Sequence, residues 1–390
     1  MNGSRKFAAP LLQILLIGSL SFIFLVPFNN PYKDIDLQVS FVIACGITAL
    51  LALVYAVNLR QWTFRINTNL ILFALFYLTC DITLLHTHSR LDVFGFAGVR
   101  LGFLELMSCV TIGWALSYIC AKRYLRAFYT STVTLALFSI IYSALLDHTV
   151  FRLGGPIFQA DILAAYLGAG FIVGIYLRSR ESYKFLLCGQ LILGGTILLT
   201  ETRTVIYSLL LLGICTAYFT AKRRCSLNIK PVVLVVVSLV FMSALLFTKT
   251  RLTNVHYGVV SIEYRAELAR TALADIHKEP FFGYGQGSLY SVLSCHRMFE
   301  PMLLATCSQG YGFTSTHNVF LDKTLELGIF TGLLYFLIYI RALLHASSRE
   351  PWLYMLILIG LYYLTNVTDV PLELLYWCIV MRVLRKEERL

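Results

Sequence analysis

Apolar segments of about 20 residues recur along this chain, and they constrain its fold more than any other feature of the sequence. A helix of about 20 residues crosses the roughly 30 Å hydrocarbon core of a bilayer, whereas the strands of a membrane barrel form short alternating segments. Only 14% of the residues are charged, well below the share of about a quarter that is usual in soluble domains. The sequence therefore predicts an all-α integral membrane protein.

The apolar segments predict about twelve transmembrane helices, an even number that puts both ends of the chain on one side of the membrane. We expect helices 1–9 within residues 1–248, a long polar loop at residues 249–316, and helices 10–12 with a cytoplasmic tail at residues 317–390. The predicted spans cover approximately residues 10–28, 37–58, 68–85, 100–121, 124–146, 157–177, 184–200, 203–221, 231–248, 317–340, 352–366 and 370–384.

The basic residues are distributed unevenly over the two faces that this topology defines. Most of the 32 Lys and Arg residues lie in the connections on one face, which is cytoplasmic by the positive-inside rule. The long loop at residues 249–316 is then on the opposite, extracytoplasmic face. The net charge of +11 accordingly indicates topology and contact with anionic membrane lipids, and no nucleic acid is expected as a partner.

Three residues at the outer ends of predicted spans suggest an anion-binding site. Arg152 precedes the sixth span, Arg203 opens the eighth and His317 opens the tenth. A helix N-terminus offers unpaired N–H groups and about half a positive charge, and an Arg adds a planar fork suited to phosphate. Such helix ends would form an anion site if they converge. The alternative is that each Arg contacts lipid headgroups or pairs with a neighbour such as Glu201.

The long loop contains a predicted amphipathic helix from Ser261 to His277, which should end by Pro280. Arg265 and Arg270 lie at opposite edges of its apolar stripe. A helix of this kind lies along a membrane surface or packs on the bundle, so it would hold Arg265 near the headgroup plane. The residues of the stripe are Ile262, Ala266, Ala269, Leu273 and Ile276.

The loop also contains glycines and cysteines with an expected structural role. Gly283, Gly285 and Gly287 predict a turn after the helix, and no Lys-Ser or Lys-Thr follows them as it would in a nucleotide-binding P-loop. Cys295 and Cys307 are separated by eleven residues and would lie in a compartment that oxidises thiols, so we expect a possible disulfide between them. The alternative is two separate thiols.

A metal site is not expected from this sequence. His86 and His88 share an outer loop with Asp92, but two His residues without a clear third protein ligand are weak evidence for metal binding. The eight cysteines other than Cys295 and Cys307 lie in or beside apolar segments, where Cys behaves as a small hydrophobe. We therefore predict no metal and no cofactor.

Several short motifs follow one another in the second half of the chain. They are Arg152-Leu-Gly-Gly-Pro, continuing to Asp161-Ile-Leu-Ala164, then Thr200-Glu-Thr-Arg203, Ser261-Ile-Glu-Tyr-Arg265, Pro280-Phe-Phe-Gly-Tyr-Gly285, Thr316-His317-Asn318 and Glu326-Leu-Gly-Ile-Phe-Thr-Gly332. In this order and topology, the set resembles the O-antigen ligase and polymerase superfamily of bacterial envelope glycosyltransferases. The hallmark of that superfamily is a His separated by ten residues from a Gly, here His317 and Gly328.

The chain departs from the family pattern at two places. The Arg-x-x-x-Leu spacing of the family is not met from Arg265, because Leu268 comes one residue early. The Pro-Asn pair that usually precedes Leu-Ala is replaced by Ala160-Asp161. Both departures concern the shape of the pocket more than the reaction.

The resemblance implies a GT-C-like fold and an enzyme of lipopolysaccharide biosynthesis in the bacterial inner membrane, with its active site at the periplasmic face. The donor would be a glycan on undecaprenyl pyrophosphate, and the acceptor a hydroxyl of the lipid A core. Arg203, Arg265 and Arg152 would bind the pyrophosphate without metal, and His317 would accept the hydroxyl proton or position that hydroxyl, with inversion at the anomeric carbon.

Two alternatives to the ligase remain at this stage. An O-antigen polymerase of the same superfamily would use the same donor with a growing glycan as acceptor. A flippase or exporter of lipid-linked glycan would need the anion site but no general base, so His317 would be dispensable to it. The length of the chain, its spans and its basic character favour the ligase.

Overall fold

The computed structural model of the protein describes residues 46–48, 50–51, 54, 68–86, 102–117, 121–146, 153, 159–179, 184–225, 255–293, 315–347, 350–366, 368 and 370–387. All regular secondary structure within these residues is helical, which confirms the predicted all-α class. The helices are α3 (Thr68–His86), α5 (Phe103–Leu116), α6 (Ala121–Leu146), α7 (Ala160–Arg178), α8 (Lys184–Leu199), α9 (Arg203–Cys225), α11 (Val255–Lys278), α12 (Leu289–Val292), α14 (Val319–His345), α15 (Pro351–Tyr363) and α16 (Val370–Glu387).

Three of the described helices are long and apolar enough to cross a membrane: Ala121–Leu145 in α6, Ala160–Arg178, which is α7, and Val319–His345, which is α14. Shorter apolar helices coincide with the predicted spans at 68–85, 100–121, 184–200, 203–221 and 352–366. The predicted spans at 10–28 and 231–248, and nearly all of the one at 37–58, fall outside the described residues. A helical membrane protein is thus supported, while the number of spans stays a prediction.

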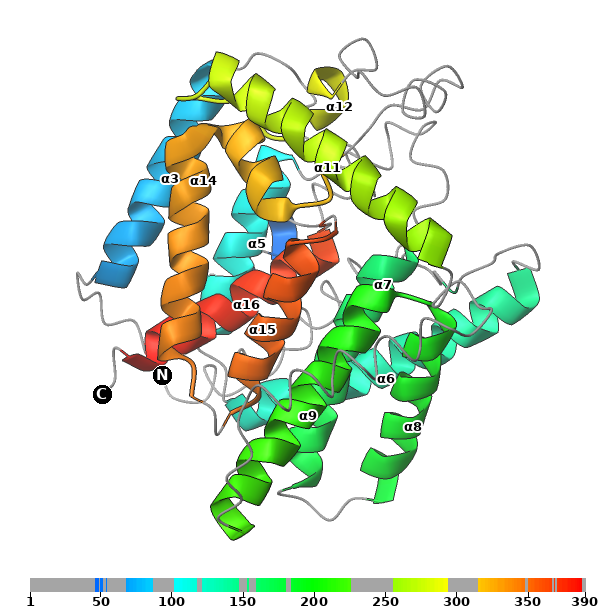
Figure 1. Cartoon of the computed structure of the whole chain (residues 1–390). Coiled ribbons are helices and arrows are strands. Elements are labelled where there is room, and N and C mark those ends of the chain that lie inside the picture. Colours follow the sequence, from blue (N-terminus) through cyan, green and yellow to red (C-terminus); the bar gives the residue numbers. More distant parts are fainter. Residues whose placement is uncertain are drawn as a thin grey trace, which may run out of the picture.

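The helices pack in two neighbouring groups that meet at α15 (Figure 1). In one group α7 packs against α6, α8 and α9, and in the other α16 packs against α5 and α14, with α3 beside α14. The short helix α15 contacts α7 and α9 on one side and α14 and α16 on the other. α11 crosses the upper end of the molecule in Figure 1 and packs on α14.

α16 is the most enclosed element, because it is apolar around nearly its whole circumference. Its crossing with α5 is close: a Cβ added at Gly113 would lie 2.7 Å from the backbone carbon of Trp377. Glycine at such a crossing lets two helix backbones approach each other. The carboxylate of Glu373 is fully buried in this core and accepts hydrogen bonds from Tyr335 (2.9 Å), Tyr363 (3.2 Å) and Trp377 (3.0 Å).

α14 is not the continuous span that the sequence predicted at 317–340. Gly328 interrupts it with a φ of 82°, so a first half at residues 319–327 and a second half at residues 329–345 meet at an angle (Figure 1). The first half is about 13 Å long at 1.5 Å per residue and cannot cross a bilayer by itself. The predicted span at 317–340 did not anticipate this break, because a hydropathy window does not register a single residue with positive φ.

The first half of α14 folds back against the second. A Cβ added at Gly332 would lie 2.7 Å from the Cα of Thr324, so glycine is required where the two halves touch. A Cβ at Gly328 would overlap the carbonyl group of Phe281, which belongs to the turn after α11. The two glycines therefore allow both the break and the contacts that stabilise it.

α11 confirms the predicted amphipathic helix in part. It begins at Val255, six residues before the predicted start, and ends at Lys278, before Pro280 as expected. Its buried face was predicted only in part: Ile276 of the predicted stripe is buried, whereas Leu273 of that stripe is 59% exposed and Leu268 and Ala272, which lie outside it, are fully buried. Apolar residues occur on two faces of this helix, and the face that is buried is the one whose Leu268 packs with residues of α12 and α14.

Candidate functional site

The N-terminus of α14 begins with a hydrogen-bonded corner at Ser315-Thr316-His317-Asn318. The buried carboxylate of Asp322 accepts hydrogen bonds from the Ser315 hydroxyl (2.5 Å), the Thr316 hydroxyl (2.7 Å) and the Thr316 backbone N–H (2.8 Å). The Asn318 side chain accepts from Leu321 N (3.1 Å) and so caps the helix. Three hydrogen bonds to one carboxylate make this corner rigid.

His317 lies at the turning point of that corner. Its φ is 59°, a left-handed conformation that costs a non-glycine residue about 1 kcal/mol or more. Its N–H donates to the Ser315 hydroxyl at 2.9 Å, which fixes the backbone in this conformation. The sequence thus maintains a strained backbone at the histidine that the motif analysis singled out, and strain of this kind is often found at functional sites.

The imidazole of His317 is half-buried and its surroundings disfavour a proton on it. Burial and the positive charge of Arg265 lower the pKa of His317 from 6.5 to about 4, against an opposing effect of Asp161. Arg265 belongs to α11 and Asp161 to the first turn of α7, so charged groups of two other helices act on this imidazole. At neutral pH the ring is therefore uncharged and can accept a hydrogen bond or a proton.

Arg265 is half-buried, and it lies on the packed face of α11. It precedes Leu268 by three residues and Ala272 by seven, so these three positions share one side of the helix. The sequence analysis had put Arg265 at the edge of a different stripe. The packing in the structure instead directs this side of α11 toward the bundle, consistent with its effect on His317.

The glycine-rich turn after α11 docks on the break in α14, and this docking holds α11 in place. Tyr284 N donates to Leu325 O (3.1 Å) and Gly285 N to Glu326 O (2.8 Å), both carbonyls at the break, while Ile329 N donates to Pro280 O (2.8 Å). Gly283, Gly285 and Gly287 all have positive φ, which confirms the predicted turn. The turn replaces hydrogen bonds that the helix loses at its break.

Buried charges strengthen the same contact. The Lys323 ammonium donates to Glu326 (3.2 Å) and to the side chain of Gln286 (3.1 Å), and the second oxygen of Glu326 accepts from Gly287 N (2.8 Å). Lys323, Glu326 and Gln286 are all buried. A buried charge without a partner is costly, so this network constrains the position of the turn relative to α14.

Arg203 is the first residue of α9 and follows a second corner, at Thr200-Glu201-Thr202. Glu201 has a φ of 51°, and Thr202 N donates to the Thr200 hydroxyl at 3.3 Å. The Thr202 hydroxyl donates to the carboxylate of Asp161 in the first turn of α7 at 3.0 Å. Because Asp161 also acts on the imidazole of His317, this second corner belongs to the same region as His317 and Arg265.

The end of α15 completes the surroundings of Arg203. Thr204, the next residue of α9, is 3.2 Å from the Thr365 hydroxyl and accepts a hydrogen bond from the Asn366 amide at 3.2 Å. Sequence analysis did not single out Asp161, Thr365 or Asn366 as site residues. An acid in the first turn of a predicted span is a signal that points to Asp161, but the two residues after α15 carry no such signal.

Other predicted site residues are not tested by the described part of the chain. Arg152, Cys295 and Cys307 lie outside the described residues, as do His88 and Asp92. Leu153, which follows Arg152, donates its N–H to Leu199 O (3.2 Å) at the end of α8. Within the described ranges no group of three His, Cys, Asp or Glu side chains is arranged to hold a metal ion.

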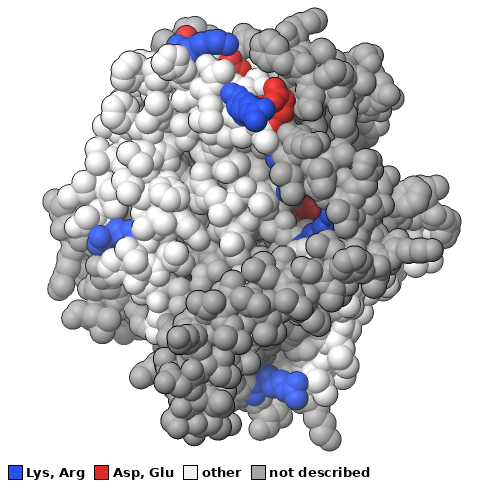
Figure 2. Space-filling model, in the orientation of Figure 1, with Lys and Arg blue, Asp and Glu red and all other residues white. Residues whose placement is uncertain are grey.

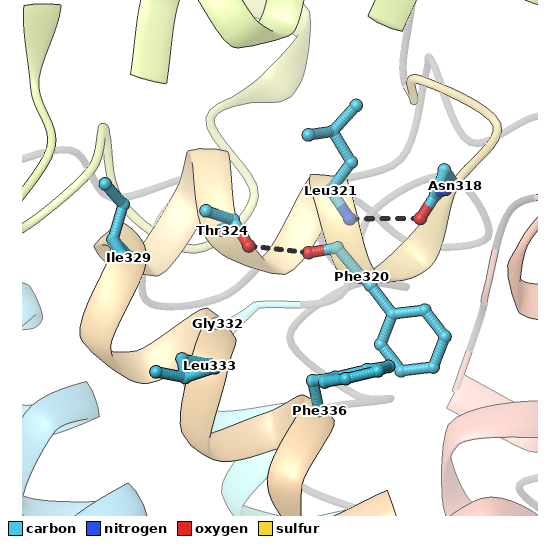
Figure 3. A pocket seen from close by; sticks show the side chains of 8 residues that line it. All are labelled: Asn318, Phe320, Leu321, Thr324, Ile329, Gly332, Leu333 and Phe336. Carbon is cyan, nitrogen blue, oxygen red and sulfur yellow. Dashed lines mark hydrogen bonds between the residues drawn. The ribbon is translucent and has the colours of Figure 1, made fainter. Parts of the chain in front are cut away.

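An apolar groove lies between the two halves of α14 and begins at Asn318, the neighbour of His317 (Figure 3). Its volume is about 390 Å³. Its polar side chains are already engaged, since the Thr324 hydroxyl donates to Phe320 O (2.8 Å) and Asn318 caps the helix. The groove thus offers a binding surface that is mostly apolar, with a polar part. Its lining residues are Asn318, Phe320, Leu321, Thr324, Ile329, Gly332, Leu333 and Phe336.

The charged side chains on this face of the molecule are few (Figure 2). Figure 2 shows them at the upper edge, where α11 lies, and in a hollow below it, with some further basic groups lower down, while most described atoms belong to uncharged residues. Large apolar side chains such as Phe330 and Leu344 are strongly exposed. Contiguous exposed apolar surface of this kind suits contact with lipid.

Comparison with known proteins gives one family assignment. Residues 188–336 match the family model described as O-antigen ligase. The matched segment runs from α8 into the second half of α14 and contains Arg203, Arg265 and His317. No curated protein matches the chain.

Proposed function

We propose that this chain is an O-antigen ligase, and the match of residues 188–336 to the O-antigen ligase family model supports its membership of that superfamily of glycosyl-transferring enzymes. It moves a glycan from undecaprenyl pyrophosphate to a hydroxyl of the lipid A core, at the periplasmic face of the bacterial inner membrane. The observation that carries the proposal is that Arg265, on the packed face of α11, and Asp161, which accepts the hydrogen bond of Thr202 next to Arg203, both act on the imidazole of His317.

The leaving group explains the need for the arginines. As the acceptor hydroxyl attacks the anomeric carbon, the bond from that carbon to the pyrophosphate oxygen breaks and negative charge builds up on the pyrophosphate. Arg265 and Arg203, with Arg152 as a further candidate, would stabilise this charge by bidentate hydrogen bonds, together with the N-terminus of α9. Attack from the side opposite the leaving group inverts the configuration of the sugar.

His317 has the properties required of the group that takes the hydroxyl proton. It is uncharged at neutral pH, and its ring is held at a rigid corner. Its pKa of about 4 is low for a general base, but Arg265 contributes to that low value. When the donor's pyrophosphate binds Arg265, its negative charge offsets the cation, so the pKa of His317 rises in the complex and the imidazole becomes a better base.

The groove between the halves of α14 supports a donor with a lipid carrier. A polyprenyl chain is uncharged hydrocarbon, and most of the groove's lining is apolar, while the Thr324 hydroxyl and the Asn318 side-chain oxygen are already hydrogen-bonded within α14. Because the groove starts next to His317, a chain lying in it would keep the attached pyrophosphate close to the candidate site. The remaining polar contacts would then be made by the arginines.

Reconstitution of the purified protein tests the proposed function. The protein is incorporated in lipid nanodiscs and mixed with undecaprenyl pyrophosphate-linked glycan and lipid A core, with EDTA and without ATP. We expect a glycan–lipid A product from the wild type and none from His317→Ala. Elongated lipid-linked glycan in place of that product would identify a polymerase. In closed proteoliposomes, movement of the donor from one leaflet to the other without any transfer would identify a flippase.

A further inference from the structure

Asp161 connects two parts of the candidate site that belong to different helices. It lies in the first turn of α7, half-buried, and its carboxylate accepts a hydrogen bond from the Thr202 hydroxyl at 3.0 Å. The same hydroxyl is 3.3 Å from Ala160 O, so Thr202 is held against the start of α7 by two neighbouring acceptors. Thr202 directly precedes Arg203, and Asp161 therefore contributes to the position of that arginine.

The charge of Asp161 also acts on His317. The charged groups that act on the imidazole are Arg265 from α11 and Asp161 from α7, and their effects on the pKa of His317 are opposite. Asp322, on α14 itself, directs its oxygens to Ser315 and Thr316. Among the described residues, Asp161 is thus the negative group that offsets Arg265 at the imidazole.

We propose that Asp161 is a positioning residue for glycosyl transfer: it holds the Thr202–Arg203 corner and supplies the negative charge that stabilises His317 once it is protonated. The inference rests on the proposed function. In the transfer step, the acceptor oxygen bonds to the anomeric carbon while the bond from that carbon to the pyrophosphate oxygen breaks. The pyrophosphate leaves with the electron pair of that bond, and the hydroxyl proton passes to the imidazole. Asp161 neither accepts that proton nor contacts the sugar.

An amide can accept the Thr202 hydrogen bond but carries no charge. Asp161→Asn therefore separates the two roles, because it preserves the corner while it removes the negative charge. Thr202→Val is the complementary variant, which removes the hydrogen bond and leaves the carboxylate.

The test is the pH dependence of transfer by nanodisc-embedded protein, measured between pH 3.5 and 8 with donor and acceptor concentrations varied. For Asp161→Asn we expect kcat to decrease by about tenfold or more, and the acid limb of the kcat/KM profile to move to lower pH by about one unit, since a nearby opposite charge typically shifts a pKa by about 1–3 units. The KM for the donor should change little.

For Thr202→Val we expect the opposite pattern: the KM for the donor should increase, and the acid limb of the kcat/KM profile should stay at the wild-type pH. Glu267→Gln, which neutralises an acid of α11 that pairs with the exposed Arg270, is the control and should leave both parameters close to wild type. A merely structural role of Asp161 would lower the rate without moving the acid limb.

Two outcomes overturn the inference and are distinguishable. If Asp161→Asn keeps the wild-type acid limb while His317→Ala is inactive, the proposed function stands and the role of Asp161 is wrong. If the wild type forms no glycan–lipid A product, the proposed function itself is wrong. A monodisperse size-exclusion profile and a thermal midpoint in detergent close to that of the wild type confirm that each variant is folded.

Discussion

The starts of α9 and α14 have the same local construction but present different residues to the site. In each, a Thr hydroxyl accepts the N–H of the residue two positions later, at 3.3 Å from Thr200 to Thr202 and at 3.2 Å from Thr316 to Asn318. In each, the residue between them has a positive φ. At α9 that residue is Glu201 and the site residue is the following Arg203, whereas at α14 the residue with positive φ is His317 itself.

The two corners also differ in what stabilises them. The α14 corner is closed by Asp322 of its own helix, so the position of His317 is determined within one element. The α9 corner is held by Asp161 of α7 and by residues at the end of α15, so the position of Arg203 depends on the packing of three helices. The comparison indicates that the histidine is positioned locally and the arginine by tertiary structure.

The largest expected effect comes from a substitution that removes the ring of His317 but keeps its backbone conformation. His317→Gly keeps the left-handed conformation without strain but removes the imidazole, and should lower transfer by about 10²–10⁴-fold, the usual contribution of a general base. Glu201→Gly makes the same change at the other corner and should leave transfer near the wild-type rate. Initial rates of product formation measure both. More than about a tenth of wild-type transfer by His317→Gly contradicts a general-base role.

Arg265 should require its planar guanidinium. Lys provides only a point charge, so we expect Arg265→Lys to be nearly as impaired as Arg265→Ala, with a loss of about 10²-fold, the order found when one donor to a developing negative charge is removed. Arg270→Lys on the same helix is the control, because the Arg270 side chain is 78% exposed and pairs with Glu267 one turn away. Full activity of Arg265→Lys would mean that positive potential alone suffices.

The pH dependence of kcat/KM should report the ionisation of His317 in the free enzyme. Since the pKa of the ring is lowered from 6.5 to about 4, activity should be constant above about pH 5 and decrease about tenfold per unit below pH 4. The sign for stability follows from the same pKa: the unfolded chain binds this proton more readily, so the folded state is destabilised as pH decreases from about 6.5 toward 4. An acid limb that persists in His317→Gly belongs to another group.

The smallest expected effect concerns stability at the α9 corner. The left-handed backbone of Glu201 costs conformational free energy that glycine does not incur, so Glu201→Gly should raise the free energy of unfolding by up to about 1 kcal/mol. The thermal midpoint in detergent measures this change. Gly283→Ala is the opposite case, because a Cβ there would lie 2.6 Å from the carbonyl oxygens of Leu325 and Glu326, and it should lower the midpoint clearly. A lower midpoint for Glu201→Gly would show that its side chain contributes more than its strain costs.

Much of the architecture could be predicted because it depends on short-range features of the sequence. Apolar segments indicated helices, and each described helix that is both long and apolar enough to cross a membrane coincides with a predicted span. Pro280 and the three glycines after it predicted the end of α11 and the turn. The ordered motifs indicated the superfamily, which the match over residues 188–336 supports. Each of these signals is contained within a few consecutive residues.

The tertiary structure decided which faces and ends meet. α11 carries apolar residues on two sides, and only its contact with α12 and α14 buries Leu268 rather than Leu273. The break at Gly328 depends on the turn that docks there, since a lone glycine in a helix is also compatible with a continuous span. Asp161 reaches Thr202 across 41 residues. The free energy of such contacts depends on the partner surface, which the pattern of a single segment does not contain.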